Sequence, residues 1–394
     1  MLSDIEIAPN LEDPLLASPY APIRYRNFPV WKIAKTAADR GWVSPTGVVH
    51  PDFALALKRY EHHALNMAAA FCGDDSSLEF TNLAAEMFAW CGFCVTAQLY
   101  EANGRQIFDF SDRAIEAVRD TDIANASLEG LQLPFESFYV RIGREANVRV
   151  RIGEAETPED FAYADGAFIS RPAEKGDDAL HIALTLVDVN GRGLPRAPRT
   201  LRFPPSVHAL PCLEALDRAV QLKWEAEQAS MGEEDTAGLE AGLENMSTSL
   251  ITDLRDSADF LKAAMPQLLS ALFWIEGLKS SPQLRPGRDT GAEQVAQWNR
   301  ASPEKQQKLK SRLTAEGYAL VRLIDYDPAS DGTAAQSGVK SAHMRRAHWR
   351  NQRHGPNSAC VKRIRIKQMF IHSRDSALTD TPGHIYVPEK RKEA

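Results

Sequence analysis

The chain has 394 residues, of which 44% are apolar and 25% are charged; these values are typical of a globular protein and exclude a disordered chain. At this length a single hydrophobic core is seldom enough, so we expect two or three subdomains. Five cysteines without a preceding secretory signal predict a cytoplasmic protein with reduced thiols. The lack of any run of about 18 apolar residues argues against a membrane span.

Charge is distributed unevenly along the chain. The net charge is −7, yet the stretch from Gly332 to Arg374 contains ten Lys or Arg and no Asp or Glu, which leaves −17 on the rest. Such an asymmetry predicts either a polyanionic partner or a basic segment that docks on an acidic body. Charge alone does not separate these two interpretations.

The first quarter of the chain is predicted to be helical. Residues 1–25 lack periodicity and are expected to form an N-terminal arm, whereas apolar residues recur at helical spacing over residues 26–104. A short helix is expected to end at Gly41. The Cys-Gly-Phe-Cys pair at residues 91–94 lies inside a helical pattern and lacks the preceding strand that a redox motif needs. We interpret these cysteines as small buried side chains.

A β-rich region is predicted next, over residues 105–210. Short runs such as "VRVRI" at residues 148–152 alternate apolar and basic side chains, as half-buried strands do. Together these runs predict a mostly antiparallel sheet. Helices return over residues 211–330, interrupted by an acidic linker near residues 229–246. Pro266 is expected to kink or split the apolar helix that follows this linker.

The last region, residues 331–394, contains the alternating pattern "VKRIRIKQMFI", which predicts a strand with a basic face. The predicted fold class is therefore α+β, with a helical N-terminal region, a mostly antiparallel central sheet, a helical segment and a basic C-terminal β-ribbon. No P-loop, G-x-S-x-G or H-E-x-x-H pattern is present. The sequence thus predicts no cofactor, no metal ligand and no catalytic residue, and it favours a binding protein over an enzyme.

The stretch "HMRRAHWRNQRHG", residues 343–355, concentrates four arginines, three histidines and one tryptophan without an acid. Its cations could pair with nucleic-acid phosphates while Trp349 stacks on a base. Alternatively, the stretch is a structural ribbon that docks on carboxylates of the body. The structural interpretation predicts that Trp349 is buried and that Arg345, Arg346 or Arg350 forms an ion pair with the body.

Two further chemistries are considered for the same segment. The available metal donors are His343, His348, His354, Cys360 and His372. Their spacing matches no standard zinc module. A nuclease that uses His348 beside the arginines would lack nearby acidic metal ligands. The candidate residues for RNA or partner binding are His343, Arg345, Arg346, His348, Trp349, Arg350, Arg353, Lys362, Arg363, Arg365 and Lys367.

These residues resemble the C-terminal signature of a type V-A anti-CRISPR family, which reads H-x-R-R-G-H-W and precedes an alternating basic strand. The positions that match are His343, Arg345, Arg346, His348 and Trp349. Ala347 stands where the family has glycine. A weaker likeness extends upstream in the same order, so the resemblance covers most of the chain.

The resemblance implies a protein of phages or plasmids that recognises the N-terminal peptide of a type V CRISPR nuclease as it emerges from the ribosome. The family then lowers the level of the nuclease mRNA. The implied partners are this nascent peptide or a similar target, together with the ribosome or RNA. A sheet edge would supply the backbone partners that peptide recognition needs. The alternative is a nucleic-acid-binding regulator, of RNA or DNA, in a mobile element.

Overall fold

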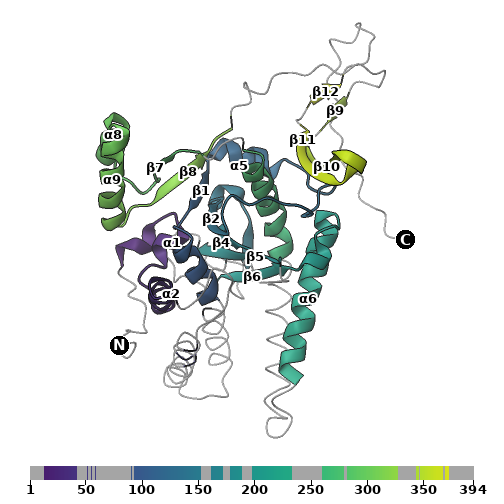
Figure 1. The fold of residues 1–394 in the computed structure, drawn as a ribbon, viewed down its shortest axis with the longest axis horizontal. Coiled ribbons are helices and arrows are strands. Elements are labelled where there is room, and N and C mark those ends of the chain that lie inside the picture. The colour runs from purple at the N-terminus through teal and green to yellow at the C-terminus, as the bar shows by residue number, and fades with distance from the viewer. Residues whose placement is uncertain are drawn as a thin grey trace.

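A computed structural model describes most of the chain, and Figure 1 shows its elements. The described residues are 13–41, 51, 55, 58, 90, 93–151, 161–171, 178–188, 198–232, 260–278, 282–326, 343–345, 347–366 and 369–371. Helices, a mixed and mostly antiparallel central sheet and a C-terminal ribbon confirm the predicted α+β class. None of the helices in these residues combines the length and apolarity that a membrane crossing requires.

The central sheet has eight strands in the order β6-β5-β4-β2-β1-β8-β7, with β3 paired to β4 beside this path. β1 pairs in parallel with β2 and β8, and the remaining pairs are antiparallel. The bounds are β1 Ile107–Phe110, β2 Ser137–Arg141, β3 Arg149–Arg151, β4 Phe161–Ser170, β5 Leu180–Asp188, β6 Arg199–Phe203, β7 Leu284–Pro286 and β8 Leu320–Ile324. The alternating runs at 105–210 therefore do form strands, and two strands from the later helical region extend the sheet.

Helices cover both faces of this sheet (Figure 1). Their bounds are α1 Ala21–Arg24, α2 Pro29–Asp39, residues 93–102, α5 Asp112–Arg119, α6 Cys212–Gly232, residues 260–276, α8 Ala292–Arg300 and α9 Pro303–Ala315. The N-terminal elements and residues 93–102 pack on one face, around Tyr139 and Phe168. Helices α5, α6 and 260–276 pack on the other face, around Phe138 and Val140. Successive residues of β2 thus enter opposite cores, as the pleat requires.

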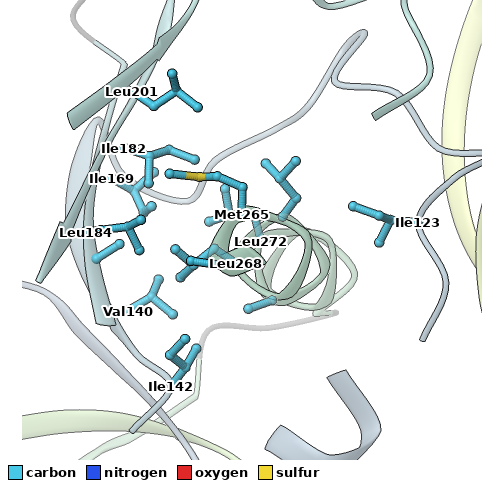
Figure 2. Packing of buried hydrophobic residues seen from close by; sticks show 14 of the residues in the cluster. Ile123, Val140, Ile142, Ile169, Ile182, Leu184, Leu201, Met265, Leu268 and Leu272 are labelled. Atoms are coloured by element: carbon cyan, nitrogen blue, oxygen red, sulfur yellow. The ribbon is translucent and has the colours of Figure 1, made fainter. Parts of the chain in front are cut away.

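The helix at residues 260–276 is the centre of the larger core. Figure 2 looks along this helix and shows Met265, Leu268 and Leu272 against strand side chains such as Ile169 and Leu184. Ile123 lies on the side away from the sheet (Figure 2). A helix that is apolar all round is expected where both sides are covered by protein.

Pro266 was expected to kink or split this helix, and it does not split it. Helical structure continues through it from residue 260 to residue 276. Proline removes one helical hydrogen bond and crowds the preceding turn. Here Met265, Leu268 and Leu269 are completely buried beside it, so packing of both halves on the sheet offsets the local cost.

The predictions for α2, for the helix after residue 211 and for Cys94 agree with the structure. The helix expected to end at Gly41 is α2, and Gly41 has a left-handed φ of 63°. The helices expected from residue 211 onward begin with α6 at Cys212. Cys94 is buried within helical residues 93–102, as its apolar context predicted. The acidic linker beyond residue 232 lies outside the described residues.

A bulge in β4 gives Asp165 its direction. The register with β5 shifts between Ala164 and Gly166, so Asp165 is the additional residue, and its carbonyl accepts from the amides of Ile142 and Gly143 at 3.0 and 2.8 Å. Bulges of this kind re-aim a side chain. The Asp165 carboxylate is thereby directed into the N-terminal core, where it meets Arg24.

Gly166 permits the close approach of β2 and β4, and we expect Gly166→Ala to be destabilising. A Cβ at this position would collide with the Tyr139 hydroxyl and the Val140 carbonyl. Overpacking against backbone costs about 1–3 kcal/mol or more, measurable as a lower denaturation midpoint. The control is Gly291→Ala, where a Cβ meets the flexible Gln294 side chain; its expected cost is below about 1 kcal/mol. Equal losses for both variants would contradict this account.

Candidate functional site

The basic stretch forms a long antiparallel ribbon at the periphery of the molecule (Figure 1). Its strands are β9 His343–Arg345, β10 His348–His354, β11 Cys360–Ile366 and β12 Met369–Ile371. β10 pairs with β11 and β9 pairs with β12. Both strand pairs have the same register. Moving three residues back from His348 and three residues forward from Ile366 leads to the pair Arg345 and Met369. The two small sheets are therefore parts of one ribbon.

Trp349 anchors the ribbon to the central helix. Its side chain is 4% exposed, and its Nε1 donates to the Ser270 hydroxyl at 3.3 Å. Its ring meets Phe273 edge-on, with centroids 5.7 Å apart. The prediction that Trp349 is buried is confirmed, so this indole is not available to stack on a base.

Arg363 is the main polar link between ribbon and body. Nε and Nη2 donate to the two carboxylate oxygens of Glu276 at 2.7 and 2.6 Å. Nη1 donates to the carbonyls of Ser127 and Glu129 at 2.8 and 2.7 Å. The guanidinium also lies 5.2 Å from the centroid of the Phe273 ring. Bidentate pairing and two further acceptors satisfy most of the donors of this buried cation.

Arg365, directly opposite Trp349, binds the body through aromatic rings. Its guanidinium lies 4.4 Å from the Trp274 ring centroid and 5.3 Å from that of Tyr326. Cation–π contacts of this kind favour arginine over lysine because the planar group stacks on rings. Arg365 therefore serves to hold the ribbon in place.

Further contacts complete the inner side of the ribbon. The Asn351 amide donates to the Ser127 hydroxyl at 2.5 Å. Arg353, whose side chain is 60% exposed, lies 3.6 Å from the Glu129 carboxylate. The backbone of Asp122 donates to Ala347 and accepts from Trp349, at 3.0 and 2.8 Å. One edge of the ribbon is thus bonded to the segment that follows α5.

The opposite side of the ribbon faces away from the body. Side chains of paired residues share a face in an antiparallel ladder, so the outer ribbon face consists of His348, Arg350, Gln352, His354, Cys360, Lys362, Ile364 and Ile366. Arg350, Gln352, His354 and Lys362 are exposed. Arg350 forms no ion pair with any residue in the described ranges, because the register turns it outward. The predicted ion pair was expected of at least one of Arg345, Arg346 and Arg350, and the side chains of Arg345 and Arg346 lie outside the described residues.

The remaining candidate residues lie at the distal end of the ribbon. For His343 and Arg345 the structure gives the strand position only, and Arg346, Lys367 and His372 fall outside the described residues. Among the side chains that can be placed, no three His, Cys, Asp or Glu lie close enough together to hold a metal ion.

A second site, not anticipated from the sequence, lies where the parallel strands β1 and β8 end. Its centre is the buried Asp109. One carboxylate oxygen accepts from the Tyr20 hydroxyl at 2.8 Å and from Arg288 Nε at 3.2 Å. The other accepts from Arg141 at 3.2 Å. Burial and the Asp109 charge raise the pKa of Tyr20, so its hydroxyl remains a neutral donor.

An open pocket of about 480 Å³ lies above this cluster. It is lined by Asp109, Ser111, Asp112, Arg113, Arg285, Pro286, Gly287, Arg288, Val321, Leu323 and Asp325. Its apolar lining residues, Pro286, Val321 and Leu323, are called the floor below, and its charged lining residues, which carry both signs, are called the rim. A hydrogen bond from the Ser111 hydroxyl lowers the pKa of Asp325. Arg113 and Arg285 are exposed and form no ion pair within the described part of the chain.

The position of this pocket follows a general rule. Ligands of sheets with parallel strands bind in the crevice beyond the carboxyl ends of those strands. In the sequence, the only sign of the site is Asp109 within the apolar run "IFDF". A buried carboxylate of this kind needs cationic partners, but Arg141 and Arg288 are not recognisable as those partners before the fold is known.

The structure thus combines a basic ribbon, attached to an α+β body through Trp349 and Arg363, with an open pocket lined by charges of both signs. Residues 108–372 match the model of the AcrVA2-like family, described as the anti-CRISPR type V subtype A2 family. Since this match spans more than half of the chain, the protein belongs to that family. The match includes the strands from β1 to β12.

A solved chain titled "Crystal structure of AcrVA2" is similar to this chain at 11% identity and a TM-score of 0.34, with 87% of this chain and 93% of that chain covered. No curated protein matches. The family assignment therefore depends on the family model, and it makes a component of type V CRISPR systems the target class.

Proposed function

We propose that this protein binds the nascent N-terminal peptide of a type V CRISPR nuclease, or of a similar target, and thereby causes translation-dependent loss of its mRNA. The observation that carries the proposal is membership of the type V subtype A2 anti-CRISPR family over residues 108–372. The signature from His343 to Trp349 lies within that range. The protein acts here as a recognition factor, and we assign it no catalytic step.

We place the peptide in the open pocket beyond β1 and β8. The half-buried Leu323 offers an apolar surface for a peptide side chain, beside the more deeply buried Val321 and Pro286. Recognition of an extended peptide needs such a floor together with polar groups that fix its direction. The volume of about 480 Å³ is sufficient for a short peptide end rather than a folded domain.

The charged residues of the rim could bind the N-terminus of a peptide. Asp325 is kept ionised by the Ser111 hydroxyl, which lowers its pKa, and can accept from an α-ammonium group. Arg113 and Arg285 are free to donate to carbonyls or acidic side chains further along the peptide. Asp109 is already paired with Arg141 and Arg288, so it supports the floor and does not bind the peptide directly.

Fluorescence anisotropy with synthetic peptides tests this placement. Labelled peptides that carry the first residues of type V nucleases should bind saturably, and scrambled peptides should not. Leu323→Asp places a charge on the floor and should weaken binding at least tenfold. Asp325→Asn should weaken binding roughly tenfold, the loss of about one charged hydrogen bond.

The matched control is Glu316→Gln, an exposed carboxylate at the end of α9 that does not line the pocket. It should bind as the parent does. A nuclease transcript that keeps its normal level in cells expressing the protein, together with no peptide binding, would refute the proposed function. Binding that survives Leu323→Asp would refute only the pocket.

A further inference from the structure

The two faces of the ribbon carry different side chains: those of the inner face contact the body, and those of the outer face contact solvent. Trp349, Arg363 and Arg365 on the inner face are used to hold the ribbon on the body. The outer ribbon face presents Arg350, Gln352, His354 and Lys362 to solvent. No acidic residue occurs anywhere between residues 343 and 371. The positive charge of the outer ribbon face therefore has no counter-charge within the ribbon itself.

The spacing of this face is regular. Arg350 lies opposite Ile364 and Gln352 lies opposite Lys362, so the two cations are diagonal neighbours about 7–8 Å apart. Each seven-residue strand spans about 23 Å. This surface, two strands wide and this long, is a platform that Trp349 and Arg363 attach to the helix at residues 260–276.

The shape and side chains of the platform distinguish among nucleic acids. The major groove of B-form DNA is about 12 Å wide and admits a two-stranded β-ribbon, with arginine, lysine and glutamine suited to base edges. Single-stranded RNA binders instead need exposed aromatic platforms, and Trp349 is turned inward. The major groove of A-form RNA is too deep and narrow for side chains to read.

We propose that the outer ribbon face is a DNA-binding surface that enters the major groove of duplex DNA. Arg350 and Lys362 would contact phosphates or guanine edges, and Gln352 would lie between them along the groove. This activity is separate from peptide binding, because the ribbon face and the pocket share no residue. It would give the protein a second partner, the DNA of a mobile element or of its host.

Fluorescence anisotropy with the full chain tests the proposal. A mixed-sequence DNA duplex should bind at about 50 mM salt, with affinity that falls steeply as salt rises. The double variant Arg350→Gln/Lys362→Gln should weaken binding at least tenfold and reduce the log–log salt slope by roughly 2, one unit for each lost phosphate contact. Single-stranded RNA of the same length should bind at least tenfold more weakly than the duplex.

The control variant removes two positive charges from α9, away from the ribbon. Lys305 and Lys308 are exposed on α9, and Lys305→Gln/Lys308→Gln should leave DNA affinity and salt slope unchanged. Thermal unfolding of both double variants should match the parent, because all four side chains face solvent. No duplex binding at low salt, tighter binding to RNA, or equal losses in the two double variants would each overturn the proposal.

Discussion

Arg363→Met is expected to lower the free energy of unfolding by about 3–5 kcal/mol, the usual cost of removing one partner from a buried ion pair. The Arg363 side chain is 1% exposed and that of Glu276 is 16% exposed. Without the guanidinium, Glu276 keeps a charge next to Phe273 with no cation to bind. The carbonyls of Ser127 and Glu129 also lose their donor. Urea denaturation followed by circular dichroism measures the change.

The matched control for this variant lies on the same ribbon. Arg350→Met makes the identical chemical change on the outer face, where the side chain is exposed and has no ion pair among the described residues. It should alter stability by less than about 0.5 kcal/mol. The pair Arg363→Met/Glu276→Met should recover part of the loss, because the uncompensated carboxylate is gone. Similar losses for Arg350→Met and Arg363→Met would show that the ribbon is not docked as described.

Arg24→Leu should produce a loss of similar size, about 3–5 kcal/mol. Arg24 and Asp165 lie 2.6 Å apart with side chains only 4% and 5% exposed. The other guanidinium nitrogen donates to the Ser18 carbonyl, and the second Asp165 oxygen accepts from Thr185 at 2.7 Å. Burial lowers the pKa of Arg24, but Asp165 together with Tyr25 and Tyr139 outweighs burial, so the pKa of Arg24 is raised.

A surface ion pair provides the comparison. Lys35 and Asp39 also lie 2.6 Å apart, but their side chains are 47% and 59% exposed. Lys35→Leu should therefore cost less than about 1 kcal/mol. Limited proteolysis should also cut the N-terminal segment of Arg24→Leu faster than that of the parent. If Arg24→Leu unfolds at the same denaturant concentration as Lys35→Leu, the buried pair does not hold this segment.

Much of the fold could be predicted from local patterns. Alternation over residues 137–141 and 180–188 indicates strands, and apolar spacing with Pro303 indicates α9, because these signals depend only on near neighbours. The helix α5 is not evident from the sequence, because it is only eight residues long and half of these are charged. The parallel pairing of β1 with β8 joins segments more than 200 residues apart, and no local pattern encodes such a partner.

In the candidate site, too, local sequence predicts some features and others depend on the fold. Burial of Trp349 could be predicted from its type, but the arginine that pairs with the body, Arg363, could not be singled out. Which arginines face inward depends on strand parity and on the register across the turn at residues 355–359. Arg363 shares the face of Trp349, whereas Arg350 does not. The Asp109 pocket is lined by three separate parts of the chain, residues 109–113, 285–288 and 321–325, and only the fold brings them together.

The contacts of Tyr20 and Arg24 constrain the order in which the chain can fold during its synthesis. Both emerge early from the ribosome, yet Arg24 binds Asp165 and Tyr20 binds the backbone of Arg288, 141 and 268 residues later. At a translation rate of about 5–20 residues per second, Arg288 is synthesised roughly 15–50 s after Tyr20. The N-terminal segment lies outside the range of the family match. We therefore expect it to close one face of the sheet as a late step, after most of the chain has been synthesised.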